Sequence, residues 1–387
     1  MELKRGTWYK KYINCPEDKR DYDILRRGYM ESRETMAREY CERYNIPDLS
    51  DSEKREINEF WAHYGIKLKD YSYHRMYYHV TGIHDVKFVP DYIAGLVIYP
   101  YYNDFTFENT WRDKNMFESL LPNVPTPETY GKCARNRLFV NGKFYKRDDL
   151  GIQIFADEIC KKVASQSREV IVKDARDTGF GKGVKKYRIT DCNSVLSILK
   201  DWEKSQNFII QKCCKQHPIF EKFNKSSVNI IRILSWRHDD EVDIIFATLR
   251  AGIDGAITDM SFVDGVKMVQ LAGIELNGKF KNKVLNQDGK VVKEFSDVGD
   301  VPCWDKIIKI IKENHLHIDN FDIVGWDFTV DEDENPICFE WNIQWPGTVF
   351  YQYTSGPLFG RKTEEILSFL ELEYNRDNYI PYYLRLK

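Results

Sequence analysis

The N-terminal part of the chain shows apolar residues at the three- to four-residue spacing of amphipathic helices. Between residues 17 and 64 these positions are embedded in Arg, Glu and Lys, and Asn45-Ile46-Pro47 interrupts the pattern. Apolar residues at this spacing cover one face of a helix, and proline ends a helix. We therefore expect two helices that pack their apolar faces on the rest of the protein. A partner-binding helix is the alternative.

Downstream of Asp113 the pattern changes to short apolar runs rich in β-branched and aromatic residues, which alternate with helical patterns. Such short runs predict strands. The expected strands cover residues 169–173, 208–212, 228–236, 243–252, 321–330 and 337–343, and the expected helices cover 116–121, 155–164, 191–203, 303–315 and 362–373. Asn141-Gly142 between two apolar runs predicts a tight hairpin over 138–145. These elements predict a mixed α+β protein with mostly antiparallel sheets.

Length and composition indicate the class of protein. A chain of 387 residues exceeds the usual size of one hydrophobic core, so we expect two or three lobes that share a cleft. Hydrophobic residues at 42% and charged residues at 30% are typical of an ordered globular protein. The formal net charge of -3 argues against nucleic acid or an anionic membrane as the main partner.

The termini and cysteines bear on the compartment. Met1 to Lys11 has no apolar core of a secretory signal, and the longest apolar stretch, 92–102, is about half the roughly 20 residues that cross a bilayer. The nine cysteines include no CxxC pair, which argues against zinc and disulfide frameworks. Reduced thiols in the cytoplasm are the expectation, and Cys213-Cys214 is interpreted as packing, not as a redox pair.

The first chemical motif is a lysine at the end of a strand, followed by a glycine-rich loop. Lys173 ends the strand, and Gly179, Gly181 and Gly183 follow at alternate positions. Glycine lets backbone N–H groups approach an anion, and the lysine adds a fixed positive charge. The next element is a strand, unlike the helix that follows a Walker or dinucleotide loop. We interpret the loop as a phosphate cover, with a flexible hairpin tip as the alternative.

The second motif lies on the strands expected at 321–330 and 337–343. Glu340 and Asn342 are two residues apart on a strand, so their side chains share a face. Asp327 can meet them from the neighbouring strand. All three side chains offer oxygen ligands, and the set contains no imidazole or thiolate. Such a set suits Mg²⁺ or Mn²⁺ bound to a polyphosphate. Three solvated residues on an exposed face are the alternative, which the flanking aromatic residues disfavour because unpaired buried carboxylates are unfavourable.

Four segments, in chain order, carry a resemblance to a known family. Residues 326–331, with 339–342 and Pro346-Gly347, resemble the metal-binding hairpin of ATP-grasp ligases. Lys114 resembles the first nucleotide lysine of that family, and Lys173 with its glycine loop resembles the second. The segment 208–214 resembles the strand that holds adenine, which assigns that role to Gln211, Lys212, Cys213 and Cys214. The resemblance implies an ATP-grasp fold, in which two α/β lobes clamp ATP and Mg²⁺.

A narrower resemblance extends over nearly the whole chain. Residues 58–61, 216–218, 227–233, 249–252 and 356–360 are similar to the sugar-transfer-associated ATP-grasp proteins found with bacterial capsule and surface polysaccharide genes. The expected organisation is a helical N-terminal region at 1–110, a first lobe with the glycine loop at 111–205, a second lobe with the metal hairpin at 206–375 and a tail at 376–387.

Three further residues are candidates for catalysis. Arg232 alternates with apolar neighbours on a strand, so its buried charge needs a partner. We favour a phosphate or acyl-phosphate contact over a structural ion pair, and the same two alternatives stay open for Arg250. His217, beside Pro218, either acts in catalysis or caps the following helix.

The resemblance implies catalysis by fixed charge: two lysines on the α and β phosphates, the oxygen triad on Mg²⁺ and Arg232 on the transferring phosphoryl group. We expect an ATP-dependent carboxylate–amine ligase that acts through an acyl phosphate on a surface polysaccharide or its precursor. A kinase without ligation is the alternative. A non-catalytic module that regulates a glycosyltransferase is the third hypothesis, which the intact oxygen triad disfavours. The sequence determines neither the acceptor nor the amine nor the oligomeric state.

Overall fold

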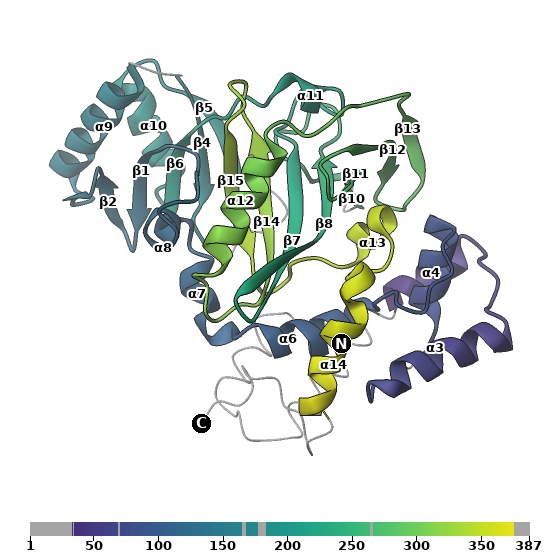
Figure 1. The fold of residues 1–387 in the computed structure, drawn as a ribbon. Coiled ribbons are helices and arrows are strands. Elements are labelled where there is room, and N and C mark those ends of the chain that lie inside the picture. The colour runs from purple at the N-terminus through teal and green to yellow at the C-terminus, as the bar shows by residue number, and fades with distance from the viewer. Residues whose placement is uncertain are drawn as a thin grey trace.

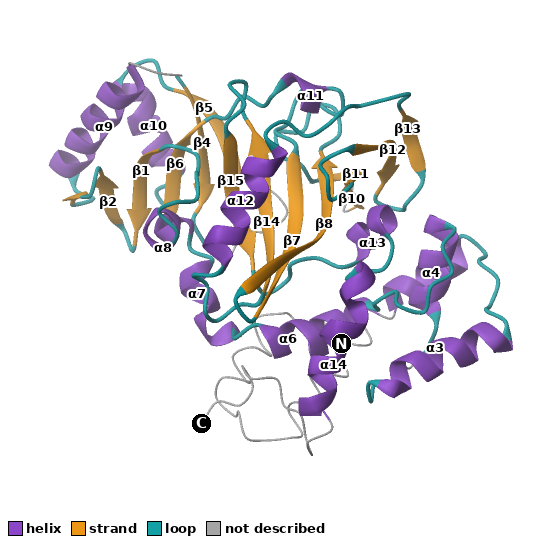
Figure 2. Cartoon of the chain, in the orientation of Figure 1, coloured by secondary structure: helices purple, strands orange, loops and turns teal. Residues whose placement is uncertain are grey.

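The computed structural model describes residues 33, 35–68, 70–164, 168–176, 183–263 and 266–374. Figure 1 shows two β-sheets side by side, with helices at the N-terminal end of the described chain grouped beside the larger sheet. Figure 2 shows the same arrangement by element type, and every strand pair in the described residues is antiparallel. The expected α+β class with mostly antiparallel sheets is confirmed.

The N-terminal region is helical. Residues 35–43 form a helix, and short elements follow: α3 (Asp51–His63), α4 (Ser72–Thr81), α5 (Asp91–Ile93), the π-helix η1 (Ala94–Ile98), α6 (Tyr99–Tyr102), η2 (Phe105–Phe107), α7 (Glu108–Trp111), η3 (Lys114–Met116) and α8 (Phe117–Leu120). Ser50 and Glu53 form a reciprocal capping box that starts α3. The predicted break at Pro47 is confirmed, because residues 46–50 separate two helices.

The smaller sheet has the strand order β3-β2-β1-β6-β4-β5. Its strands are β1 (Thr129–Ala134), β2 (Arg137–Val140), β3 (Lys143–Tyr145), β4 (Glu169–Asp174), β5 (Val184–Arg188) and β6 (Phe208–Lys212). Helices α9 (Asp149–Ala164) and α10 (Cys192–Asp201) bury their apolar faces in one core with this sheet. The hairpin expected at Asn141-Gly142 is confirmed, and both residues have positive φ, at 48° and 76°.

The larger sheet has the strand order β13-β12-β11-β8-β7-β14-β15. Its strands are β7 (Ile230–His238), β8 (Glu241–Ala251), β11 (Gln270–Ile274), β12 (Phe280–Asn286), β13 (Val291–Glu294), β14 (Ile323–Val330) and β15 (Pro336–Asn342), and β9 (Ser261–Val263) pairs with β10 (Val266–Met268) in a separate ribbon. The remaining helices are α11 (Pro218–Glu221), α12 (Trp304–His315), α13 (Val349–Ser355), η4 (Gly360–Lys362) and α14 (Thr363–Tyr374).

Both faces of the larger sheet are covered. One face packs with α12 in a core that includes Ile233, Trp326 and Ile311. The other face shares a core with the N-terminal helices, α13 and α14, and this core includes Trp61 and Trp236. The N-terminal helices therefore extend the core of the larger lobe, as their apolar faces predict.

Two features differ from the sequence-based expectation. The boundary expected between 205 and 206 would put the strand at 208–212 in the second lobe, whereas β6 pairs with β1 and β4 inside the smaller sheet. Strands β9 to β13 were not predicted; β9 and β10 have only three residues each, and β13 is exposed along its whole length. In the described part of the chain, no helix has the length and apolar character needed to span a membrane.

Candidate functional site

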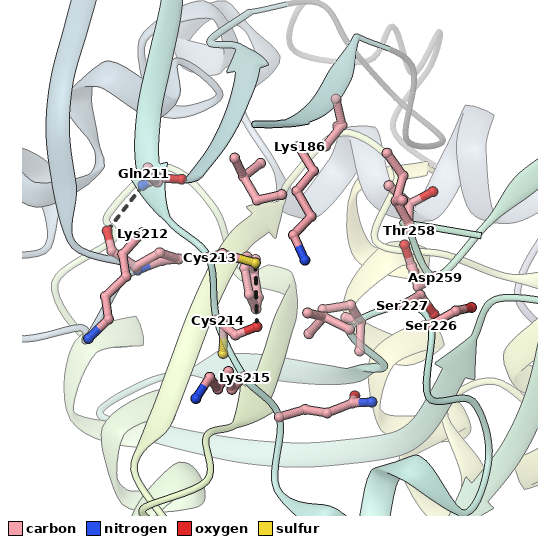
Figure 3. Close-up of a pocket in the computed structure, with 18 of the residues that line it drawn as sticks. Lys186, Gln211, Lys212, Cys213, Cys214, Lys215, Ser226, Ser227, Thr258 and Asp259 are labelled. Atoms are coloured by element: carbon pink, nitrogen blue, oxygen red, sulfur yellow. Dashed lines mark hydrogen bonds between the residues drawn. The ribbon is translucent and has the colours of Figure 1, made fainter. Parts of the chain in front are cut away.

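A cavity of about 440 Å³ lies where the two sheets meet. Residues of β4, β5 and the 211–216 segment line it from the smaller sheet, and residues of β8, β14 and β15 line it from the larger sheet. Figure 3 shows Gln211 and Lys212 on one side and Thr258 with Asp259 on the other, while Lys186 points between them. Nine of the residues predicted from sequence line this cavity: Lys114, Lys173, Gln211, Lys212, Cys213, Cys214, Arg250, Asp327 and Glu340.

Two lysines far apart in the sequence meet in the cavity. Lys173 lies near the end of β4, with its ammonium 5.6 Å from the centroid of the Phe339 ring. Lys114 follows Asp113, which caps η3 and pairs with Arg176, and its Nζ lies 3.3 Å from Oε2 of Glu340. Burial, reinforced by the neighbouring Lys114 and opposed by Glu340, lowers the pKa of Lys173 to about 8. An anionic ligand would relieve this unfavourable positive charge.

The predicted glycine loop is described only in part. Gly183 has a φ of 72°, and its carbonyl accepts a hydrogen bond from the Asp174 amide where β4 meets β5. Gly179 and Gly181 lie outside the described residues. The described residues therefore place the end of the loop at the β4–β5 turn, next to Lys173.

The 211–214 segment connects the two lobes along one wall. The Gln211 amide donates to the Pro127 carbonyl at 3.2 Å, and the backbone amides of Lys212 and Cys213 donate to Glu128 and Glu169. Both cysteines are free thiols, and burial raises the pKa of Cys214 to about 12. Ile171, Val184 and Phe339 add apolar surface to the same cavity. A flat heterocycle with polar edges fits between such apolar side chains and a backbone strand.

The predicted oxygen residues come together on two paired strands. Asp327 on β14 stands opposite Glu340 on β15, and Asn342 lies on the same strand as Glu340. The Asn342 Nδ2 donates to Asp327 Oδ2 at 3.2 Å, so the amide and the carboxylate are in contact. Asn342 does not itself line the cavity, whereas Asp327 and Glu340 do.

Two arginines hold Asp327. Arg232 binds it in a bidentate manner, with Nε 2.5 Å from Oδ1 and Nη2 2.9 Å from Oδ2. Arg250 donates to Oδ2 at 3.0 Å. Burial by itself would raise the pKa of Asp327, but the two guanidinium groups outweigh it and hold that pKa below its usual range. Asp327 is therefore an ionised carboxylate in a buried, strongly polar environment.

The donor set fits a divalent cation of the Mg²⁺ class. Asp327, Glu340 and Asn342 supply carboxylate and amide oxygens, which are the ligands that Mg²⁺ and Mn²⁺ prefer. Among the described residues, no group of three His, Cys, Asp or Glu side chains forms another candidate metal site.

His217 has a local role in the structure. It is the N-cap of α11, and its Nδ1 accepts a hydrogen bond from the Ile219 amide at 3.2 Å. Its Nε2 lies 3.8 Å from Glu334, and the side chain does not line the cavity. Of the two alternatives that the sequence left open, this geometry matches the cap.

Two residues that contact Arg250 were not predicted from sequence. Asp259 lines the cavity, and its Oδ2 lies 2.8 Å from Nε of Arg250. Tyr351 accepts a hydrogen bond from Arg250 Nη1 at 3.2 Å and lies 5.7 Å from the Arg232 guanidinium. Asp259 lies in a loop that has no apolar periodicity, so the only signal for it in the sequence is its carboxylate side chain.

Comparisons with known proteins bear on this geometry. The sequence model of one family, described as sugar-transfer associated ATP-grasp, matches residues 97–366. A comparison with the curated proteins gives no match. Among solved structures, D-alanyl-alanine synthetase A from Vibrio cholerae O1 biovar eltor is 9% identical over 68% of this chain and 66% of its own, with a TM-score of 0.41.

Two further solved structures are similar at the same level. VanG D-Ala:D-Ser ligase from Enterococcus faecalis is 10% identical over 67% of this chain and 61% of its own, with a TM-score of 0.40. D-cycloserine synthetase DcsG is 13% identical over 70% and 73%, with a TM-score of 0.40. This chain thus spans only about two thirds of the length of these enzymes.

The family match and the cavity coincide in the chain. The matched residues 97–366 contain every cavity-lining residue, from Lys114 to Glu340. They also contain both β-sheets of the described structure. Because the match extends over more than half of the 387 residues, the chain belongs to the sugar-transfer-associated ATP-grasp family.

Proposed function

We propose that this protein is an ATP-dependent carboxylate–amine ligase that modifies a bacterial capsule or surface polysaccharide, or its precursor. The observation that carries the proposal is the convergence of two lysines and two carboxylates in one cavity between the sheets. Opposite charges placed around a polyphosphate are what phosphoryl transfer requires of a protein. The glycan context rests on the description of the family. The expected cytoplasmic location is part of the same proposal.

The proposal assigns the nucleotide to the wall formed by the 211–214 segment. The adenine would lie against Ile171, Val184 and Phe339, and its edge would meet the backbone of Lys212, Cys213 and Cys214. Lys114 and Lys173 would then bind phosphate oxygens, with the glycine loop over them. A lysine whose charge is unfavourable when the site is empty becomes stabilised once phosphate oxygens surround it.

The oxygen residues would hold the divalent cation of the nucleotide. Asp327, Glu340 and Asn342 are the ligands in this proposal. When bound, Mg²⁺ or Mn²⁺ would neutralise charge on the β and γ oxygens. Arg232 keeps Asp327 ionised and oriented through its bidentate contact, and Arg250 stands in the cavity wall beside it. The acceptor carboxylate would attack the γ phosphorus and release ADP, and an amine would then displace inorganic phosphate from the acyl phosphate to form the amide.

Trapping with hydroxylamine tests the ligase reaction. The protein is incubated with ATP, Mg²⁺ and a panel of sugar acids and amino acids, first with amines and then with hydroxylamine in their place, and products are read by mass spectrometry. We expect an amide in the first case and a hydroxamate in the second, because hydroxylamine captures an acyl phosphate.

The same experiment identifies the kinase alternative. Every residue named above serves phosphoryl transfer to a hydroxyl equally well. A stable phosphorylated acceptor that no amine consumes, without any hydroxamate, would exclude the ligase and leave the kinase in its place. If the protein binds ATP but hydrolyses none of it with any acceptor, the non-catalytic regulatory module is the remaining hypothesis.

A further inference from the structure

Arg250 contacts two carboxylates in the cavity wall at the same time. Its Nη2 donates to Asp327 Oδ2 at 3.0 Å, and its Nε lies 2.8 Å from Asp259 Oδ2. The second contact is an ion pair whose two atoms are buried and not aligned for a hydrogen bond. Arg250 is 4% exposed, and both carboxylates line the cavity. Arg250 and Asp259 therefore form an ion pair without a hydrogen bond, and a movement of the guanidinium group can align the two atoms for one.

The hydrogen bonds to Asp327 are crowded on one of its two oxygens, Oδ2. Oδ1 accepts one hydrogen bond from Arg232, and Oδ2 accepts three, from Arg232, Arg250 and Asn342. A carboxylate has about four lone-pair positions, two on each oxygen, so the three donors fill Oδ2. A divalent cation can therefore bind Oδ2 of Asp327 only if donors withdraw from it.

The two arginines differ in how firmly they are held. Arg232 makes two bonds to Asp327, and its Nη1 also donates to the Pro346 carbonyl at 2.5 Å. It does not line the cavity. Arg250 makes a single bond to Asp327, lines the cavity and already has a second carboxylate within 2.8 Å. Arg250 also donates to Tyr351, and of the two arginines it is the one whose withdrawal breaks fewer bonds to Asp327.

We propose that Arg250 occupies Asp327 in place of the divalent cation and moves onto Asp259 when the cation binds. Asp259 is then a positioning residue, because it acts on the cation site only through Arg250. The inference rests on the proposed function, which assigns Asp327 to the cation. This coupling is reciprocal. Cation binding changes the equilibrium of Arg250 between Asp327 and Asp259 by the same factor by which that equilibrium changes the affinity for the cation.

Mn²⁺ binding tests the inference without any acceptor. Electron paramagnetic resonance measures free Mn²⁺ in the presence of the non-hydrolysable analogue AMP-PNP. We expect Arg250→Gln to bind Mn²⁺ about tenfold more tightly, because a competing charge-assisted bond to Asp327 is gone. We expect Asp259→Asn to bind it about tenfold more weakly, because Arg250 then has only Asp327 as an anionic partner.

The double variant separates the exchange from simple loss of negative charge. In the Arg250→Gln background, Asp259→Asn should weaken Mn²⁺ binding by no more than about threefold, since no arginine remains to be positioned. Asp322→Asn is the matched control, because Asp322 binds Arg237 through Nε and Nη2 at 2.9 and 2.7 Å outside the cavity. This control should leave Mn²⁺ binding unchanged.

Each contrary result has a defined meaning. An equal effect of Asp259→Asn in both backgrounds, or weaker Mn²⁺ binding in Arg250→Gln, overturns the exchange and leaves the proposed function intact. If the wild type itself binds no Mn²⁺ with nucleotide, the proposed function falls and the exchange falls with it. Circular dichroism checks folding, and Arg250→Met, which is also neutral, replaces the glutamine variant if that one does not fold.

Discussion

At the scale of single residues, burial makes Lys173 sensitive to pH. It is 8% exposed, and burial together with Lys114 lowers its pKa to about 8. The ammonium form therefore predominates below pH 8 and is lost as pH rises through that value. If this ammonium binds phosphate oxygens, nucleotide affinity depends on the same proton.

We therefore predict that ATP affinity of the wild type falls as pH rises from 7 to 9.5. Lys173→Arg should remove most of this fall, because an arginine keeps its charge throughout the range. Lys173→Ala should weaken binding at pH 7 by a few kcal/mol, as expected for the loss of a charge in a partly enclosed site. Calorimetric titrations with AMP-PNP at several pH values measure all three. A wild type and an arginine variant with the same pH profile would contradict the prediction.

Glu340 carries the prediction for the divalent cation. It faces Asp327 across the β14–β15 pair, and its side chain, which contacts Lys114, is 33% exposed and so lies outside the core. We predict that Glu340→Gln keeps its fold but loses nearly all turnover and Mg²⁺-dependent nucleotide binding. Wild-type turnover should also stop in excess EDTA. Normal activity of the variant, or activity in EDTA, would show that the carboxylate binds no metal.

At the scale of elements, Gly347 determines where α13 lies relative to the cavity. Its φ is 118°, and a Cβ at this position would lie 1.8 Å from Cε2 of Tyr351. Tyr351 is the residue of α13 that accepts a hydrogen bond from Arg250 and lies beside Arg232. The turn before α13 is thus coupled to the buried charges through one aromatic ring.

We predict that Gly347→Ala lowers the free energy of unfolding by about 2–4 kcal/mol and also weakens nucleotide binding. Gly142→Ala is the matched control, because Gly142 has a φ of 76° but no atom within 4 Å of the added Cβ. The control should lose about 1 kcal/mol from backbone strain and bind nucleotide normally. Urea unfolding and calorimetry measure the two quantities. Equal losses in both variants would mean that the contact with Tyr351 is unimportant.

At the scale of the whole molecule, one cavity receives a lysine from the smaller sheet and two carboxylates from the larger sheet. Lys173 comes from the smaller sheet, whereas Asp327 and Glu340 come from the larger one. Lys114 precedes both sheets and makes the ion pair with Glu340 that joins the two sides. A nucleotide in this position would have its phosphates between the lysines and the cation ligands.

This arrangement predicts the products. If Asp327 and Glu340 hold a cation on the terminal phosphates, attack would occur at the γ phosphorus, so we expect ADP and inorganic phosphate in equal amounts. Chromatography of the nucleotide products in a complete reaction measures this directly. AMP and pyrophosphate as the main products would mean attack at the α phosphorus and would require a different placement of the nucleotide in the cavity.

Much of the fold could be predicted because its signals are local. The alternation of β-branched residues predicted β4, β6, β7, β8, β14 and β15, and Asn141-Gly142 predicted the β2–β3 hairpin. These features depend on neighbours within a few residues in the chain. Strands β9 to β13 escaped prediction; β9 and β10 have three residues each and β13 is exposed throughout, so neither length nor apolar alternation marks these three in the sequence.

The sequence by itself determined the class of fold, the order of the motifs and the pairing of Asp327 with Glu340, since strand periodicity and a short turn are encoded locally. Only the tertiary structure decided which charges meet. Arg232 and Asp327 are 95 residues apart, Arg250 and Asp327 are 77 apart, and Asp259 joins them from a loop without a pattern. The sequence shows that a buried arginine needs a partner, but the order of strands in the sheet selects that partner.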